Sequence, residues 1–205
     1  MGGVRGHRRT GKVRTLIAGG ALALLGLLIT GTGWASDARS GPDPRLRALL
    51  IDAVAEADSF ADRFDAEVWL TDMSNRLTRQ VPDPKERLDI LKRVHYEASR
   101  VDLAPELVLA VIDVESNFDR FAISRVGAQG LMQIMPFWLK EIGRPDDNLF
   151  HLNTNLRMGC TILRYYLDVE RQDLVRGLGR YNGSLGRRSY ADKVIERLRT
   201  KWYRL

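Results

Sequence analysis

Apolar residues recur at helical spacing through most of the chain beyond residue 45, and this pattern limits the fold more than any other feature. Leu46, Leu49, Leu50 and Ala53, for example, lie at positions i, i+3, i+4 and i+7 and so share one face of a helix. No segment shows the sustained two-residue alternation of β-branched and aromatic residues that strands prefer. We therefore predict an all-α (mainly α) fold.

The same periodicity sets the expected elements. We predict helices over residues 46–57, 64–77, 88–96, 105–115, 131–142, 152–169, 174–181 and 190–202. Asp83 is suited to cap the third of these, with Pro84 at its first position. For residues 121–127, a short hairpin remains an open alternative to an irregular loop.

The first 35 residues have the composition of an export signal. Basic side chains and no acidic ones occupy residues 5–14, an apolar stretch follows at 16–29, and small residues stand at Gly33 and Ala35. We expect residues 1–35 to be a cleaved signal peptide or a signal anchor, and the protein to be exported to the periplasm or cell envelope. If residues 1–35 are a signal anchor, the protein is associated with the membrane through this segment.

Composition shifts mark two further regions. Residues 36–44 are rich in Ser, Gly, Pro and Asp, so we predict a linker and N-terminal helices over 36–88. These helices either pad the main domain or form a stalk. We predict one compact domain over 89–205.

The net charge of +6 belongs mostly to the leader. Removing residues 1–35 takes away 5 of the 32 basic side chains and none of the 26 acidic ones, which leaves 27 − 26 = +1. Residues 171–205 still carry 10 basic and 3 acidic side chains. Such a segment favours an anionic polymer or lipid headgroups, although a solvated helix face is the commoner explanation. Without interleaved stacking aromatics, it does not indicate nucleic-acid binding.

The residue types that bind metals are too sparse for a metal centre. Cys160 is the only cysteine, so neither an internal disulfide nor a thiolate zinc cluster is expected. The three histidines are far apart in the sequence, and no two have metal-ligand spacing. We expect no metal and no cofactor, and we expect Cys160 to be a buried apolar residue.

Glu115 is the most unusual polar residue in the chain. It shares the apolar face of the helix 105–115 with Val108, Val111 and Ile112. A carboxyl group that is removed from water has a raised pKa and can serve as a general acid near neutral pH. The simpler alternative is a glutamate at a helix end whose tip reaches solvent.

Two later segments favour the interpretation of Glu115 as a general acid. Gly127 and Gly130 allow tight turns and a close approach to the backbone, and Gln133 follows them in an otherwise apolar run. At 181–183, Tyr-Asn-Gly stands at a predicted helix end. A hydroxyl from Tyr181 that reaches back to Glu115 would orient the carboxyl group.

These segments together resemble the lytic transglycosylase family, which has a lysozyme-like catalytic domain. The matching segments are Glu-Ser-x-Phe at 115–118, Ala-x-Ser at 122–124, Gly-Ala-x-Gly-Leu-Met-Gln-Ile-Met-Pro at 127–136 and Tyr-Asn-Gly at 181–183. The resemblance covers roughly residues 90–205. It implies that residues 89–205 form a transglycosylase catalytic domain acting on peptidoglycan glycan strands.

The resemblance also implies roles for individual residues. Glu115 matches the catalytic acid/base. The expected substrate-binding residues are Gln133, Met135, Tyr181, Asn182, Ser116 and Ser124, with Tyr181 matching the tyrosine that holds the catalytic glutamate. The chain departs from the family at 137–139, where Phe-Trp-Leu replaces small residues and threonine. We expect these aromatics to be core residues rather than part of the binding groove.

The family's chemistry needs one carboxylate. As the resemblance implies, enzymes of this family cleave the β-1,4 bond between N-acetylmuramic acid and N-acetylglucosamine and leave 1,6-anhydro ends. One glutamate acts first as acid and then as base. One alternative is a hydrolytic lysozyme on the same fold, with Asp119 as the second carboxylate. Another is a non-catalytic peptidoglycan-binding scaffold within a cell-envelope protein complex.

Overall fold

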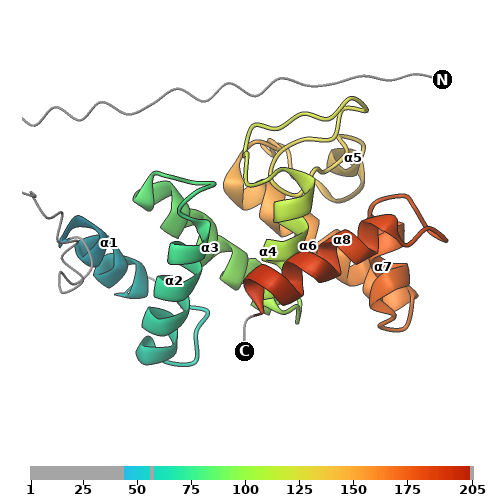
Figure 1. Cartoon of the computed structure of the whole chain (residues 1–205). Helices are drawn as coiled ribbons and strands as arrows, with labels where there is room; N and C mark the ends of the chain where they lie inside the picture. Colours follow the sequence, from blue (N-terminus) through green and yellow to red (C-terminus); the bar gives the residue numbers. More distant parts are fainter. Residues whose placement is uncertain (1–43, 56–57, 204–205) are drawn as a thin grey trace, which may run out of the picture. The chain divides into compact units, whose positions relative to one another are not determined.

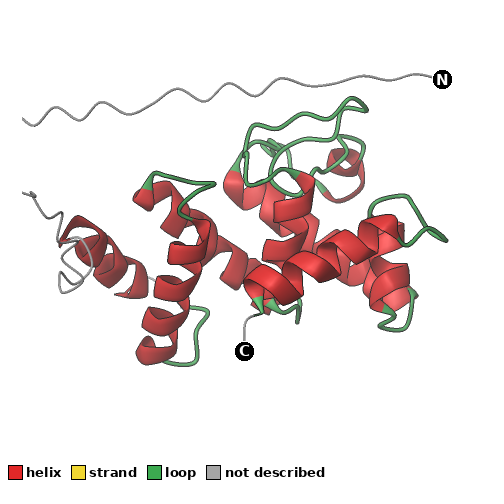
Figure 2. Ribbon diagram, in the orientation of Figure 1, coloured by secondary structure: helices red, strands yellow, loops and turns green. Residues whose placement is uncertain are grey.

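The computed structural model describes residues 44–55 and 58–203, and this part of the chain is helical without a strand (Figures 1 and 2). The predicted all-α fold is therefore confirmed. The elements are α1 (Pro44–Ala55), α2 (Arg63–Leu77), α3 (Pro84–Arg100), α4 (Pro105–Glu115), α5 (Trp138–Ile142), α6 (Leu152–Val169), α7 (Leu174–Tyr181), α8 (Ser189–Arg197) and the π-helical turn η1 (Leu198–Trp202).

The N-terminal helices pack on the rest of the described chain. All described residues belong to one compact unit, and both α1 and α2 contact α3. Helix α3 also runs through the domain boundary predicted between residues 88 and 89. The segment predicted as an export signal or anchor, residues 1–35, lies outside the described residues. Among the helices that are described, none is long and apolar enough to cross a membrane.

Helix α3 begins where its capping residues predict. The Asp83 carboxylate accepts hydrogen bonds from the backbone N–H groups of Lys85 and Glu86, each at 3.3 Å, and Pro84 occupies the first helical position. One turn later, the buried Arg87 donates to Ser74 Oγ at 2.9 Å and to the Val81 carbonyl at 2.6 Å. These bonds fasten α3 to α2.

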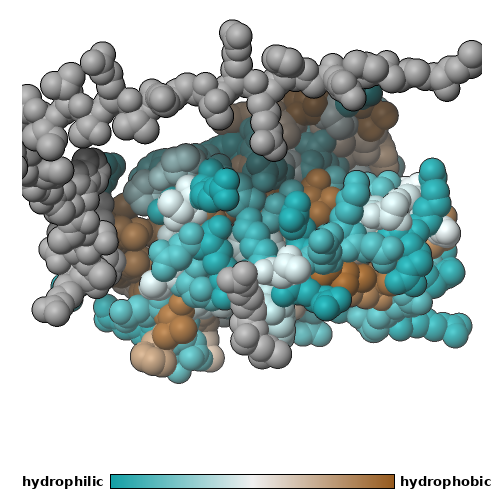
Figure 3. Space-filling model, viewed as in Figure 1, coloured by the Kyte–Doolittle hydropathy of each residue, from teal (hydrophilic) through white to brown (hydrophobic). Residues whose placement is uncertain are grey.

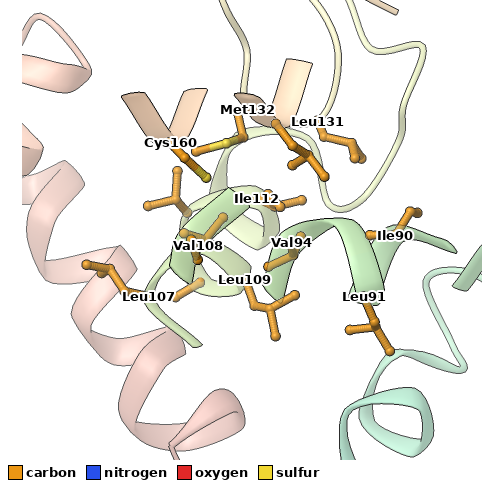
Figure 4. Close-up of a cluster of buried hydrophobic side chains, with 14 of the residues drawn as sticks. Ile90, Leu91, Val94, Leu107, Val108, Leu109, Ile112, Leu131, Met132 and Cys160 are labelled. Atoms are coloured by element: carbon orange, nitrogen blue, oxygen red, sulfur yellow. The ribbon is translucent and has the colours of Figure 1, made fainter. Parts of the chain in front are cut away.

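Helix α4 is the centre of the core. Every residue from Leu107 to Ile112 is buried, and the helix contacts α3, α8 and η1. Figure 4 shows Val108 and Ile112 near Met132 and Cys160, and the predicted burial of Cys160 is confirmed. Since burying each such aliphatic side chain stabilises the fold by roughly 1.5–3 kcal/mol, α4 is held firmly in place.

The prediction of a helix over residues 131–142 is wrong for its first half, because only Trp138–Ile142 is helical. Gly130 and Gln133 have φ values of +75° and +48°, in the left-handed region, and these interrupt a right-handed helix. The chain instead makes isolated antiparallel bridges, Ile123 with Gln129 and Gln129 with Ile134. The hairpin alternative at 121–127 is thus reduced to single bridges within a loop, which Figure 2 shows in green above α4.

The prediction that the aromatics after Pro136 are core residues is wrong for Phe137. Its side chain is 52% exposed, whereas Trp138 is half-buried and packs edge-on against Tyr166 of α6. Trp138 is the first residue of α5 and packs against the core, whereas Phe137 precedes the helix and its exposed ring pairs with that of Trp138.

The packing of α6 against Met132 makes a glycine necessary at position 159. A Cβ atom built there lies 2.3 Å from Met132 Sδ and 2.8 Å from Met132 Cβ. In an exposed helix, Gly→Ala normally stabilises the fold by up to about 1 kcal/mol. We expect Gly159→Ala to destabilise it by about 1–3 kcal/mol because the core is overpacked. Urea unfolding followed by circular dichroism measures this, and a gain in stability would contradict the packing described here.

Candidate active site

Glu115 is the last residue of α4 and is half-buried. Tyr190, in the first turn of α8, is buried, and its hydroxyl donates a hydrogen bond of 2.6 Å to Glu115 Oε1. The bond joins residues 75 positions apart in the sequence. It depends on the packing of α8 against α4, so the orientation of this carboxyl group is a product of the tertiary fold.

Burial raises the pKa of Glu115 to about 7, because the charged carboxylate loses its hydration there. Hydrogen bonds from the side chains of Tyr190 and Asn182 act in the opposite direction, since they stabilise the charged form. Desolvation is the larger effect. The carboxyl group is therefore protonated in a large fraction of molecules near pH 7, as a general acid requires.

Tyr181 does not hold Glu115 in the way that the sequence suggested. Its hydroxyl donates to the Met132 carbonyl at 2.7 Å, and the hydroxyl that contacts Glu115 belongs to Tyr190. Burial is the main cause that raises the pKa of both tyrosines well above the usual value, with the nearby Glu115 charge adding to it. Both hydroxyls thus remain hydrogen-bond donors at any physiological pH.

Tyr190 carried a sequence signal of its own. It precedes Val194 by four residues on the apolar face of α8, which places its ring in the core. A buried tyrosine needs a partner for its hydroxyl. The sequence thus indicated that the Tyr190 hydroxyl needs a partner in the core, and the structure identifies that partner as Glu115.

The chain after Glu115 is held in an unusual backbone conformation. Asn117, Phe118 and Gln133 all have φ between +48° and +68°, a costly region for residues other than glycine. Ser116 Oγ donates to the Leu131 carbonyl at 2.8 Å, which ties the end of α4 to the segment before Gln133. Backbone strain of this kind is often found at functional sites.

The side chains of Gln133 and Ser124 are engaged within this loop. Gln133 Nε2 donates to the carbonyls of Gly130 at 3.0 Å and Ala122 at 3.2 Å, and the backbone N–H of Ala128 donates to Ser124 Oγ at 3.0 Å. Both residues therefore shape the loop. Neither side chain contacts the Glu115 carboxyl group through these bonds.

A buried asparagine that the sequence did not single out fixes the loop from below. Asn155 of α6 donates from Nδ2 to the carbonyls of Gln129 and Leu149, at 2.9 and 2.8 Å, and accepts from the Met132 N–H at 2.8 Å. Gly130 lies so close that a Cβ atom on it would stand 2.3 Å from Asn155 Nδ2. The pair holds the loop against α6.

The remaining expected residues are Asn182, at the end of α7, and Met135, in the loop before α5. Asn182 is exposed at the C-terminal cap of α7 and bonds Glu115 through its side chain. Met135 is half-buried, and its carbonyl accepts from the Trp138 N–H at 3.0 Å at the start of α5. Asn182 therefore joins Glu115 and Tyr190 directly, whereas Met135 belongs to the loop.

The two other carboxylates near Glu115 in sequence, Asp113 and Asp119, accept hydrogen bonds from other groups. Asp113 is only 5% exposed and accepts from Lys201 Nζ at 2.9 Å and Trp202 Nε1 at 3.1 Å. Asp119 accepts from the N–H of Phe121 at 2.9 Å within its own turn. In the described part of the chain, no group of three or more His, Cys, Asp or Glu side chains is arranged to hold a metal ion.

A known protein-family model matches the part of the chain that contains Glu115. The model described as "Transglycosylase SLT domain" matches residues 93–201, which is 109 of the 205 residues. The chain is 32% identical over 108 residues to the "Transglycosylase" of Enterobacteria phage PRD1, with 49% of this chain and 40% of that protein covered. It is also 32% identical over 97 residues to the "Membrane-bound lytic murein transglycosylase C" of Actinobacillus pleuropneumoniae, with 43% of this chain and 26% of that protein covered.

The similarity thus spans less than half the length of either of these relatives. Among solved structures, the inactive mutant of lytic transglycosylase Slt from Pseudomonas aeruginosa is 21% identical with a TM-score of 0.44, and the match covers 78% of this chain and 34% of that one.

The raised pKa of Glu115 affects the stability of the folded protein. Its pKa is about 7 in the folded state against 4.5 for the unperturbed group. The folded state therefore keeps a proton that the unfolded state releases, and the free energy of unfolding falls as pH rises from about 4.5 to about 7. At one pKa unit per about 1.4 kcal/mol, the loss approaches about 3 kcal/mol above pH 7.

We expect Glu115→Gln to remove this loss. At pH 8 the free energy of unfolding of the variant should exceed that of the wild type by up to about 3 kcal/mol, and the difference should shrink towards pH 4. Urea unfolding at a series of pH values measures the difference. Glu141→Gln removes a carboxyl group at an exposed position and is the control. A constant offset between Glu115→Gln and wild type at all pH values would contradict the raised pKa.

Proposed function

The chain belongs to the transglycosylase SLT domain family, and on this basis we propose that it is a peptidoglycan lytic transglycosylase. Its reaction is cleavage of the β-1,4 bond between N-acetylmuramic acid and N-acetylglucosamine, with formation of 1,6-anhydro-muramic acid ends. The observation that carries this proposal is the half-buried carboxyl group of Glu115, with a pKa of about 7 and a hydrogen bond from Tyr190.

The proposed reaction uses Glu115 twice. The protonated carboxyl group gives its proton to the glycosidic oxygen as the bond from that oxygen to C1 breaks. The acetamido oxygen of the substrate stabilises the cation that forms at C1. The Glu115 carboxylate then takes the proton of the C6 hydroxyl, whose oxygen bonds to C1 and closes the anhydro ring. Glu115 ends the cycle protonated, ready for the next bond.

Tyr190 and Asn182 support both steps because their side chains donate to the carboxylate form. Their hydrogen bonds stabilise the charge that appears on Glu115 after the first proton transfer. Burial favours the protonated form before it. The opposing effects keep the pKa of Glu115 near neutrality, where one group serves as both acid and base.

A hydrolytic lysozyme is less well supported. A second carboxylate that activates water must lie about 6.5–9.5 Å from the acid and be free to take a proton. Asp119 accepts a backbone hydrogen bond in its own turn, and Asp113 is bound to Lys201 and Trp202. A non-catalytic scaffold has no use for a carboxyl group with a raised pKa.

The remaining parts of the proposal concern substrate and location. We assign Gln133, Met135 and Asn182 to contacts with the glycan strand, because they lie on the segments that flank Glu115. Export to the periplasm or cell envelope rests on the composition of residues 1–35. Attachment to the membrane and membership of a cell-envelope complex remain predictions.

The products distinguish the candidate activities. We expect residues 36–205 to release muropeptides from purified peptidoglycan that are about 18 Da lighter than hydrolysed ones, since intramolecular attack by the C6 hydroxyl replaces water. Glu115→Gln should release none. Mass spectrometry of the soluble products makes the measurement. If the wild type releases products with reducing ends and substitution of Asp119 abolishes them, the protein is a lysozyme instead. If the wild type releases no products, the non-catalytic scaffold is favoured.

The pH dependence tests the role of Glu115 as the acid. Since its pKa is about 7, we expect kcat/KM to fall about tenfold per pH unit above that value. Tyr190→Phe removes a hydrogen bond that lowers the pKa, so the fall should move to higher pH while the maximum rate drops. Asp119→Asn is the control and should leave the profile in place. An unshifted profile for Tyr190→Phe would contradict the assignment.

A further inference from the structure

A pocket with an excess of positive charge lies between α2, the end of α4 and the α8–η1 segment. We call it the cationic pocket. Its volume is about 520 Å³, and its charged lining residues are Arg76, Arg79, Asp113, Arg197 and Lys201. They come from α2 and the segment after it, from α4, and from α8 and η1. Figure 3 shows that the surface over α8 is mostly hydrophilic.

The charges within the cationic pocket do not balance. Arg76 is paired with Asp72 at 2.6 Å, and Asp113 bonds Lys201 at 2.9 Å, with Arg197 further away at 3.9 Å. Within residues 44–55 and 58–203, Arg79 has no ion pair and no side-chain hydrogen bond. Setting aside the Arg76–Asp72 pair, three cations face one carboxylate, which leaves a net charge of +2.

The unbalanced cations also act on one another. Burial is the main cause that lowers the pKa of Lys201, and the positive charges of Arg197 and Arg79 lower it further against the opposing effect of Asp113. An anion between Arg79 and Arg197 would relieve this repulsion. Their guanidinium groups present planar donors that match a carboxylate in two-point hydrogen bonding.

We propose that the cationic pocket binds a carboxylate of the stem peptide carried by peptidoglycan. The inference rests on the proposed function, because that function supplies the ligand. The three cations outweigh the one carboxylate and attract an anion, and the stem peptide carries its negative charge as carboxylates.

The spacing along α8 between Tyr190, which bonds Glu115, and the cationic pocket suits a stem peptide. Tyr190, which bonds Glu115, and Arg197, which lines the cationic pocket, lie seven residues apart in α8, or about 10 Å along the helix. An extended peptide of about four residues spans roughly 13 Å. A stem peptide attached to a muramic acid beside Glu115 is therefore longer than the spacing along α8 between Tyr190 and the Arg197 side of the cationic pocket.

The test compares two substrates and two charge-matched double variants. The substrates are peptidoglycan strands with their stem peptides and strands from which an amidase has removed them. Arg79→Gln with Arg197→Gln removes the excess charge from the pocket. Arg63→Gln with Arg171→Gln removes two exposed arginines elsewhere and is the control. Circular dichroism and thermal unfolding establish that each variant is folded.

We expect the pocket variant to raise KM about tenfold on peptide-bearing strands and to leave the stripped strands unaffected, because two partly exposed charge pairs are lost. The control variant should resemble the wild type on both. An equal rise in KM on the two substrates, or no rise on either, would overturn the proposal. A loss in the control as large as in the pocket variant would overturn it as well.

A binding measurement separates this proposal from the proposed function. Isothermal titration calorimetry with Glu115→Gln compares a disaccharide that carries a tetrapeptide with the same disaccharide without it. Tighter binding of the peptide-bearing ligand, lost with Arg79→Gln and Arg197→Gln, supports the pocket even if the wild type cleaves neither substrate. Equal binding of the two ligands would overturn the pocket, while cleavage of the stripped strands by the wild type would still support the proposed function.

Discussion

The hydrogen bond between Tyr190 and Glu115 is the interaction on which the rest of the site depends. It requires α8 to pack on α4 and requires the carboxyl group to lie where water is largely excluded. Burial then raises the pKa of Glu115 to about 7, while the hydroxyl keeps the charged form accessible. A more exposed glutamate would lose its proton at neutral pH, and a carboxyl group buried without a partner would rarely release it. The fold therefore sets the proton affinity as well as the position of the candidate acid.

The loop after Glu115 stores strain that the surrounding structure must offset. Left-handed conformations at Asn117, Phe118 and Gln133 are unfavourable in isolation. Asn155 compensates by bonding two backbone groups of the loop, at Gln129 and Met132, together with the Leu149 carbonyl before α6. Ser116 bonds the Leu131 carbonyl and so fastens the beginning of the loop. The result is a rigid segment beside the carboxyl group, built with almost no regular secondary structure. Such rigidity suits a site that must hold a sugar ring in one orientation.

The N-terminal helices contribute to this arrangement at both ends of α4. Trp69 of α2 donates to Glu106 in the first turn of α4 at 2.7 Å, and Gln80 donates to Asp113 near its end at 3.2 Å. These contacts, together with the packing of α1 on α2 and α3, favour the view of both helices as part of the packed unit over the view of them as a stalk. They also bring Arg76 and Arg79 to the cationic pocket, which the helices after residue 84 do not form alone.

The sequence by itself determined the helical class, the capped start of α3 and the unusual placement of Glu115 at the end of an apolar helix face, because these depend on local spacing and on the cost of burying charge. Its motifs also indicated the family. It did not determine that residues 131–137 leave the helix, that Phe137 stays at the surface, or that Tyr190 rather than Tyr181 donates a hydrogen bond to Glu115. Those outcomes depend on contacts between segments tens of residues apart, such as Asn155 with the loop and α8 with α4. Residue spacing along one helix carries no information about which distant side chain fills the space beside it, and only the tertiary structure decides that.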